Sequence, residues 1–331
     1  MLRLRSSEWR GRTSAGRKKL CVFFLLRLIG ALAAAVTVQG VTIEAHAQGV
    51  SLPPVNLGDT SFLDGIAFPG FVVQETLSHF RADQFRDANG NDRPGSNRIT
   101  VNSAVTQLAW ISNFRLLGGF YGAEVLIPLA DVDADTDFGP NGRERGLGDM
   151  SVAPIFIQWP QYKLLDMPFY QRLNLLFKVP TGEYRDRNSV NVGSNLYSFN
   201  PYYAFTLLPT PKLEFSSRLY YLWNSENDDP FFRLGADDTQ PGQAFHMNYA
   251  ASYEVWENFR IGLAGYLLYQ LTDDKVDGND IDQSRERVVS LGPGARYRID
   301  TWTMTFNSYF EAEAENRPEG VKLVFRVSKV F

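Results

Sequence analysis

The strongest constraint on the fold is a two-residue alternation of apolar and polar side chains, which recurs in segments of about ten residues after position 48. In FYQRLNLLFKVP, for example, Phe169, Leu173 and Phe177 alternate with Arg172 and Lys178. Alternation with this period is typical of a β-strand with one apolar and one polar face. No stretch after residue 48 approaches 18 consecutive apolar residues, so the sequence predicts strands and no membrane-spanning helix.

Twelve such segments are present, and the first two alternate least clearly. They cover residues 70–80, 98–114, 119–129, 148–159, 169–180, 196–208, 213–224, 244–256, 259–271, 287–299, 302–313 and 321–331. Five connections are short and six are long. The short ones are 115–118, 160–168, 209–212, 257–258 and 300–301; the long ones are 81–97, 130–147, 181–195, 225–243, 272–286 and 314–320. Because they alternate, we expect an antiparallel meander with short turns at one end and long loops at the other.

Two features favour a membrane barrel over a soluble β-sandwich. The segments YSFNPYYAF and SRLYYLW place several aromatic residues near strand ends, as expected where lipid headgroups meet water. The opposite faces carry Arg, Lys, Glu, His and Asn, which suit a wet lumen. Backbone groups in lipid must all be paired, which forces the sheet to close. The predicted fold is therefore all-β, a transmembrane antiparallel up-and-down β-barrel of about 12 strands.

The last strand, VKLVFRVSKVF, is expected to close the barrel by pairing with the first strand. Val321, Leu323 and Phe325 alternate with polar residues, and the chain finishes on Phe331. This pattern predicts a C-terminal signal read by the barrel-assembly machinery, with Lys329 as a departure on the apolar face. An even strand number places both termini and the short turns in the periplasm, and the long loops outside.

Residues 1–47 are expected to be a cleaved signal peptide. A cationic stretch precedes an apolar run at 28–38, and Ala45-His46-Ala47 is a small-x-small cleavage signature. The apolar run is too short for a retained membrane helix. Processing would remove the only cysteine, Cys21, and leave 25 basic against 35 acidic residues, a net charge of −10. This charge argues against a nucleic-acid partner, and export predicts the outer membrane of a Gram-negative cell.

Several segments resemble the meta-pathway phenol-degradation outer-membrane family, also called MetA-like or SphA-like. They occur in order over nearly all of the chain after residue 48: SLPPVNLGDTSFLDGIAFPGF, FKVPTGEY, GSNLYSFNPYYAFTLLPTPKLEFSSRLYYLWNSENDDP, PGQAFHMNYAASYEV, LYQLTDDKVDGN and ENRPEG. The resemblance implies a transporter-like barrel, distantly similar to FadL-type channels for hydrophobic compounds. It implies an aromatic-degradation setting, and it carries over no catalytic or ligand residue.

Residues 48–69 are too irregular for a strand, because Pro53, Pro54, Gly58, Gly65 and Pro69 interrupt them. Two interpretations remain open, a periplasmic lead-in and a short plug that folds into the lumen and constricts it. The expected organisation is therefore a signal peptide (1–47), this segment (48–69) and a barrel (70–331).

The polar faces of the strands predict which residues line the lumen. They are Glu124, Arg172, Asn174, Lys178, Glu214, Arg218, Tyr220, His246, Asn248, Arg260, Tyr266, Gln270, Arg296, Asn307 and Arg326. We expect Arg172, Lys178 and Arg218 to form a positive part of this wall. Twelve strands lie between the small barrels filled by side chains and the open sixteen-stranded porins, so a narrow pore or a ligand-sized lumen follows.

Metal and catalytic motifs are incomplete. DVDADTD at 131–137 lacks the glycine and glutamate that an EF-hand loop requires, and we expect it and the similar DANGND and DDKVDGNDID to be solvated acidic loops. Loose binding of divalent cations, bridging to lipopolysaccharide phosphates, is the alternative. His79 and His246 are the only histidines after the cleavage site, and neither lies in a nucleophile motif. We therefore expect no enzyme, no cofactor and no metal site.

The sequence thus predicts an outer-membrane channel for passive uptake of small aromatic or hydrophobic compounds. The alternatives are a closed structural or adhesive barrel that acts through its loops and, as a minor one, an outer-membrane hydrolase. Expected partners are outer-membrane lipid, lipopolysaccharide, the assembly machinery and a small-molecule permeant, with no nucleic acid. The sequence leaves the permeant and the oligomeric state open.

Overall fold

The computed structural model describes residues 50–137 and 139–331, and the predicted signal peptide lies outside these residues. Twelve strand positions, one of them split into β7 and β8, form the wall of a barrel. They are β1 (Gly70–Phe85), β2 (Asn97–Leu116), β3 (Gly119–Thr136), β5 (Ser151–Leu164), β6 (Met167–Lys178), β7 (Ser198–Phe199) with β8 (Tyr202–Leu207), β9 (Leu213–Asn224), β11 (Ala244–Trp256), β12 (Phe259–Gln270), β15 (Arg287–Ile299), β16 (Trp302–Glu315) and β17 (Pro318–Val330).

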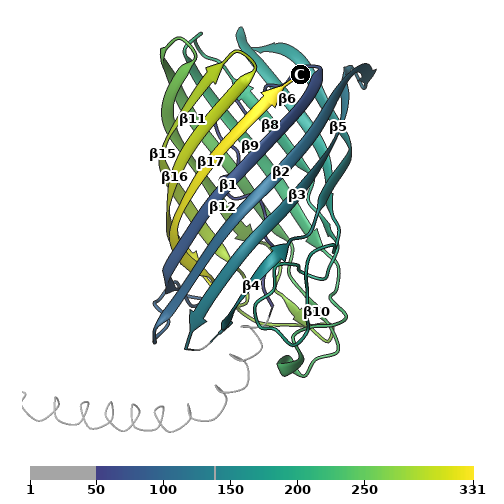
Figure 1. Cartoon of the computed structure of the whole chain (residues 1–331), viewed down its shortest axis with the longest axis vertical. Coiled ribbons are helices and arrows are strands. Elements are labelled where there is room, and N and C mark those ends of the chain that lie inside the picture. Colours follow the sequence, from purple (N-terminus) through teal and green to yellow (C-terminus); the bar gives the residue numbers. More distant parts are fainter. Residues whose placement is uncertain (1–49, 138) are drawn as a thin grey trace, which may run out of the picture. The chain divides into compact units, whose positions relative to one another are not determined.

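Each wall strand pairs antiparallel with its neighbours, and the first strand pairs with the last (Figure 1). The closing register runs from Val72 opposite Val330 to Phe85 opposite Pro318. The Phe331 backbone continues this pairing, because its N–H donates to the Phe71 carbonyl oxygen at 2.8 Å. Closure pairs the backbone groups along both edges of the wall, as lipid requires. The predicted all-β barrel of twelve antiparallel strands is confirmed.

Short turns lie at one end of the barrel and long connections at the other (Figure 1). One predicted long loop, 314–320, is wrong, since β16 continues to Glu315 and β17 begins at Pro318. Only two residues remain for the turn, and Asn316 adopts a left-handed φ of 53° there. Asparagine tolerates that conformation, which lets a polar segment that looks like a loop form a tight hairpin.

The acidic segment 131–137 is also different from the prediction. Asp131–Thr136 belongs to β3 and pairs with β4 (Gly142–Leu147) and with β2. Arg143 Nη2 lies 2.7 Å from Asp131 Oδ2, and Arg98 lies 3.2 Å from Asp135. These cross-strand arginines balance the carboxylates, so the segment extends as strand where a solvated loop was expected.

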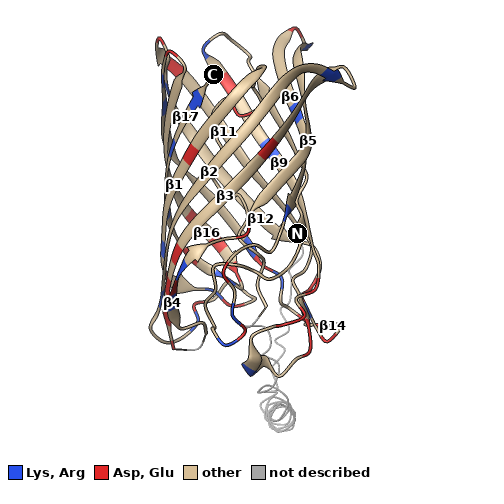
Figure 2. Ribbon diagram, turned by 45° about the vertical axis from the view of Figure 1, so that its right-hand side comes forward, with Lys and Arg blue, Asp and Glu red and all other residues tan. Residues whose placement is uncertain are grey.

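The long-loop end carries four further short elements. They are a single 3-10 turn (Phe232–Leu234), β10 (Thr239–Gln240), β13 (Lys275–Val276) and β14 (Asn279–Asp280). Most of the ribbon between the two ends is tan, and charged residues lie at both ends and at a few positions along the strands (Figure 2). None of the helical turns in the described part of the chain has the length and apolar character to cross a membrane.

The outer surface is apolar and carries aromatic side chains at the short-turn end. These exposed aromatic residues are Phe71, Trp110, Phe114, Tyr162, Trp256, Tyr297, Trp302 and Phe331. Lys329, the departure on the last strand, lies 5.0 Å from the Trp302 ring centroid and 4.5 Å from that of Phe331. A cation over aromatic rings at this level matches an aromatic girdle at the interface of lipid and water.

Residues 50–69, which we call the inner segment, run along the inside of the barrel. Val50 packs with Val276 and Ile281 at the long-loop end. At the other end the segment continues into β1 at Gly70, beside Phe331. The inner segment therefore extends from the long-loop end to the short-turn end. At the short-turn end the first barrel strand, β1, begins and the last one, β17, ends.

Candidate functional site: a lumen cavity beside the inner segment

A cavity of about 670 Å³ occupies the lumen next to the inner segment. Much of its lining comes from residues 50–60 of the inner segment, the inward faces of β1, β2 and β3, and the loop at 184–196, and further side chains of β9, β12 and β17 complete it. Its volume lies within the range of small-molecule binding sites in proteins, which is about 300–1,000 Å³.

The wall that β1, β2 and β3 contribute is largely apolar, although it faces inward. Its apolar side chains are Phe80, Ile99, Val101, Val105, Leu126, Pro128, Ala130, Val132 and Ala134. Since the outer faces of these strands must also be apolar for lipid, both faces carry similar residues. This explains why the first two strands alternate poorly in the sequence. The cavity thus presents an apolar surface on one side of an otherwise polar lumen.

A hydrogen-bonded row of polar side chains borders this apolar wall. The Gln74 amide donates to Gln107 at 2.8 Å, and the Gln107 amide donates to Glu124 Oε2 at 2.6 Å. Asn174 Nδ2 donates to Glu124 Oε1 at 2.7 Å. Glu124 is buried and lines the cavity. Its carboxylate is held by amide donors from two sides, so it offers a fixed acceptor to a bound molecule.

The inner segment is fixed to the wall by an ion pair. Arg218 Nη2 and Nε lie 2.6 Å and 2.7 Å from the two carboxylate oxygens of Asp64, a bidentate contact. Arg172 Nη2 lies 3.8 Å from Asp64 Oδ1 and donates to the Asp64 carbonyl oxygen at 3.0 Å. The Asp64 carboxylate thus faces two guanidinium groups and compensates part of the charge of the predicted positive wall.

Further polar contacts follow the inner segment along the barrel. Asn248 Oδ1 accepts from the Gly58 N–H at 2.9 Å, and Tyr309 donates to the Gly58 carbonyl oxygen at 2.8 Å. Lys322 Nζ lies 2.8 Å from Asp59 Oδ1. Ser61 donates to Asn307 at 2.9 Å. Because these contacts come from β11, β16 and β17, they hold the segment against the part of the wall that runs from β11 to the seam at β17.

Two glycines let the inner segment approach the wall this closely. A Cβ on Gly58 would lie 2.7 Å from the Tyr309 ring, and the residue has a left-handed φ of 83°. A Cβ on Gly65 would lie 2.4 Å from the backbone of Phe205 and Thr206. Any larger residue would displace the segment, so both glycines are required by packing, and Gly58 by its conformation as well.

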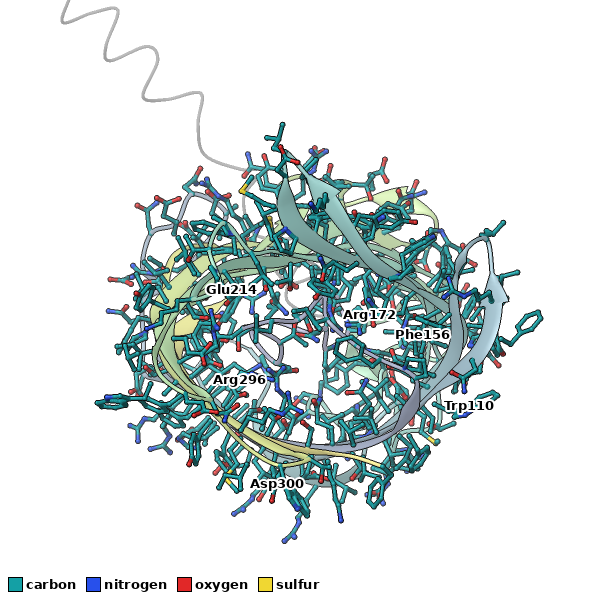
Figure 3. All side chains as sticks on the ribbon, turned by 90° about the horizontal axis from the view of Figure 1, so that it is seen from above. Trp110, Phe156, Arg172, Glu214, Arg296 and Asp300 are labelled. Carbon is teal, nitrogen blue, oxygen red and sulfur yellow. The ribbon has the colours of Figure 1, made fainter. Side chains whose placement is uncertain are left out.

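None of the fifteen predicted lumen residues is exposed. Figure 3, seen from the short-turn end, shows Arg172, Glu214 and Arg296 inside the ring of strands and Trp110 outside it. Five of the fifteen line the cavity: Glu124, Lys178, Arg218, Tyr220 and Tyr266. Six bond to the inner segment: Arg172, Lys178, Arg218, Asn248, Asn307 and Arg326.

Four of the six remaining predicted residues bond to the wall itself. Asn174, Glu214, Arg260 and Gln270 pair with Glu124, Ser252, Glu254 and Asp274. The two histidines are wall residues of different kinds. His246 is buried and stacks on Tyr220 with ring centroids 4.1 Å apart, whereas His79 bonds to Asn102 at 2.8 Å on the exposed side. Neither contact resembles a nucleophile activated by a base.

Sequence reasoning missed Asp59, Asp64, Gln107, Tyr309 and Lys322. Asp59 and Asp64 lie in an irregular segment without periodicity, so nothing in the pattern indicated which way they point. Lys322 and Tyr309 lie on correctly predicted strands, at positions of the two-residue alternation that face inward, so this alternation could have identified them. Within residues 50–137 and 139–331, no cluster of His, Cys, Asp and Glu side chains is arranged to hold a metal ion.

A family model described as "Putative MetA-pathway of phenol degradation" matches residues 82–327, most of the chain. A search of curated proteins found no significant match. Among solved structures, the COG4313 outer membrane channel from Pseudomonas putida F1 superposes with a TM-score of 0.71 at 16% identity, covering 84% of this chain and 100% of that one. The transport unit of the autotransporter AIDA-I from Escherichia coli covers 88% of this chain and 98% of its own at a TM-score of 0.49 and 10% identity.

The first of these likenesses shows that the two chains share their fold, a closed barrel of the outer membrane. The resemblance stated from the sequence motifs is confirmed by the family match, which extends from β1 to β17. The chain is an outer-membrane β-barrel and belongs to the family of the MetA pathway of phenol degradation.

Proposed function

We propose that the protein is a channel for passive uptake of small aromatic or hydrophobic compounds across the outer membrane. The observation that carries this proposal is the cavity of about 670 Å³ with its apolar wall on β1–β3. A lumen that only conducted water and salt would not need apolar side chains on its inner face. Membership of a phenol-degradation family and the shared fold of an outer membrane channel agree with this role.

In this proposal the long loops face the outside, and the permeant enters the cavity from them. The apolar side chains of β1–β3 receive its ring, and Glu124 accepts a hydrogen bond from a hydroxyl group. The inner segment acts as a plug that narrows the path beyond the cavity, because Asp64, Asp59 and Gly58 hold it inside the barrel. Flux is diffusive and needs no cofactor.

In our proposal the polar wall residues adjust which molecules pass, and the acidic loops contact lipopolysaccharide. Phe331 is the residue that the assembly machinery recognises, and its exposed side chain at the end of the closing strand supports this role. We propose no catalytic step, since the contacts of His79 and His246 fit wall residues.

The experiment blocks the cavity without changing the outer surface. Ala130 lines the cavity, whereas the preceding residue, Leu129, is exposed on the outside. Ala130→Trp should reduce uptake of radiolabelled phenol by porin-depleted cells to the level of cells without the protein, and Leu129→Trp should leave it unchanged. Both variants must show normal barrel folding on unheated gels.

Conductance in planar bilayers separates this proposal from a closed barrel. Wild-type protein should give discrete current steps, and Ala130→Trp should make them smaller. A silent bilayer from folded protein, together with uptake equal to that of cells without it, would favour the structural or adhesive alternative that acts through the loops.

A further inference from the structure

Side chains that donate hydrogen bonds, without matching acceptors, gather on the inner wall at the short-turn end, away from the cavity. In the described part of the chain, Arg296 has no hydrogen-bond or ion-pair partner, although it is half-buried inside the barrel (Figure 3). Thr305 is 3% exposed, and its hydroxyl has no partner. The amide nitrogen of buried Asn307 is also without an acceptor. Unpaired donors of this kind are costly to bury.

The strand register places these groups side by side. Arg296 on β15 lies opposite Thr305 on β16, and Thr305 lies opposite Arg326 on β17. Neighbouring strands are about 4.8 Å apart, so the two arginines flank Thr305 at a separation that their side chains can bridge. Arg326 gives one hydrogen bond, from Nη1 to the Asp59 carbonyl oxygen at 2.9 Å, and its other donors are free of partners among the described residues.

A third arginine increases the positive charge. Arg260 on β12 lies directly opposite Arg296, and like charges in this position destabilise a sheet. Arg260 itself is fully engaged, since it donates to Ser252, Glu254 and the Lys212 carbonyl oxygen. Arg260 therefore has its own acceptors, and it offers none to Arg296, whose donors stay unmatched.

The carboxylates that face this part of the lumen already have partners. Asp59 pairs with Lys322, and Asp64 pairs with Arg218. Glu214 accepts hydrogen bonds from Ser216 and Ser252. The wall thus holds unmatched guanidinium donors and an unmatched hydroxyl, and none of these carboxylates forms an ion pair with Arg296 or Arg326. This is the composition of a site for an anion.

We propose that Arg296, Thr305 and Arg326 form a binding site for a small organic carboxylate at the short-turn end of the lumen. The planar fork of a guanidinium matches the two oxygens of a carboxylate, so each arginine holds one side of the group. The Thr305 hydroxyl and the Asn307 amide donate to the remaining lone pairs. The site lies on the inner face and binds its ligand through charge, unlike the apolar cavity near the long loops.

Equilibrium dialysis of the detergent-solubilised full-length protein against radiolabelled benzoate tests this site without requiring transport. Wild-type protein should bind one benzoate per chain, and unlabelled benzamide, which has the same shape without the charge, should not compete. Arg296→Gln should weaken binding about tenfold or more, because it removes charged hydrogen bonds. Arg296→Lys should restore only part of the affinity, since it returns the charge without the fork.

Arg298 provides a matched control on the same strand, because it is exposed and bonds only to the Asp300 carbonyl oxygen. Arg298→Gln should bind benzoate as the wild type does, and Thr305→Val should weaken binding without removing it. Equal affinity of wild type, Arg296→Gln and Thr305→Val would overturn the proposal. Inorganic phosphate that competes more strongly than benzoate would show a different class of anion and would also contradict it. Each variant is first checked for the folded barrel on unheated gels.

Discussion

The two carboxylate oxygens of Asp64 lie 2.6 and 2.7 Å from the guanidinium nitrogens of Arg218, and both side chains are less than a tenth exposed. This ion pair connects the inner segment to β9 in the middle of the barrel. A buried ion pair contributes little to the free energy of folding compared with an apolar replacement of both partners. Removing only one partner, however, leaves an uncompensated buried charge. The position of the inner segment therefore depends on Asp64 more than on its solvated contacts.

Asp64→Asn should release the inner segment from the wall. Loss of one partner from a buried ion pair costs roughly 3–5 kcal/mol, so we expect faster proteolysis of residues 50–69 and larger current steps in planar bilayers. Asp59→Asn should have a weaker effect, because the Asp59 side chain is 25% exposed beside Lys322. Asp228→Asn in an exposed loop serves as the control. Identical currents from all three variants would show that the segment does not narrow the path.

The loop after β12 should loosen as the pH rises. Asp274 is buried there and accepts hydrogen bonds from the Gly242 N–H and the Gln270 amide. Burial raises its pKa to about 7, compared with about 3.9 in an unfolded chain. The folded state thus retains the proton over this interval, and the stability of the loop falls between about pH 4 and pH 7. Hydrogen exchange of residues 271–286 should accelerate across that window.

Asp274→Asn keeps the acceptor oxygen and removes the charge. Its hydrogen exchange in the same loop should show no such transition after correction for the intrinsic pH dependence of exchange. A transition of equal size in the variant would assign the effect to another group, with the nearby buried Glu286 as the first candidate.

An arginine on the lipid-facing side of β12 should lower the free energy of unfolding more at the middle of the bilayer than near its surface. Leu263 is 53% exposed at the middle of the strand, and Leu271 is exposed directly after its last residue. Arginine at the bilayer midplane costs about 2–4 kcal/mol, falling to about 0–1 near the interface. Urea unfolding in lipid vesicles should therefore show a large loss for Leu263→Arg and a small one for Leu271→Arg. Equal losses would place Leu263 outside the hydrocarbon layer.

Cysteine labelling tests the orientation of the barrel. Cys21 is the only cysteine of the chain and lies in the predicted signal peptide, so single cysteines report cleanly. Cysteines at Asp228 and Asp280, both exposed at the long-loop end, should react with an impermeant maleimide on intact cells. Cysteines at Thr210 and Asn258 in short turns should react only after the cells are broken. The opposite pattern would invert the proposed orientation.

Deletion of Phe331 should slow assembly of the barrel. Its side chain is 65% exposed, and its backbone pairs with Phe71 at the closing seam. Pulse-chase experiments should therefore show a longer-lived unfolded form for the deletion and for Phe331→Ser. Phe232→Ser changes an equally large exposed side chain in a loop and should assemble at the wild-type rate. Equal rates for Phe331→Ser and Phe232→Ser would argue against a terminal signal.

The alternation of the sequence was sufficient to predict the barrel, because one face of each strand meets lipid and the other meets the lumen. It was weakest in β1 and β2, where part of the inner face is apolar as well. The hairpin at Asn316 escaped prediction for a different reason. Its polar composition resembles a loop, and only the backbone conformation of Asn316 shows that two residues make the turn.

The candidate site could be predicted only in part. The alternation within a strand assigns Glu124, Arg218 and Arg296 to its polar face, and in the structure these side chains lie inside the barrel. It could not indicate that Asp64 neutralises Arg218, because that contact joins residues 154 positions apart through a segment without regular structure. Likewise, Arg296 is unpaired because the nearby carboxylates bond to other residues, and the sequence alone does not show these pairings.

The path of the inner segment also restricts the order of events during biogenesis. A closed barrel has no open edge through which a chain could slip sideways. Since the segment continues directly into β1, and β1 forms the seam with β17, residues 50–69 must either lie among the strands before the seam zips or pass lengthwise through a finished ring. On the first route, Asp59 and Asp64 can form their ion pairs with Lys322 and Arg218 before the sheet has closed. The inner segment would then serve as a template around which the strands assemble.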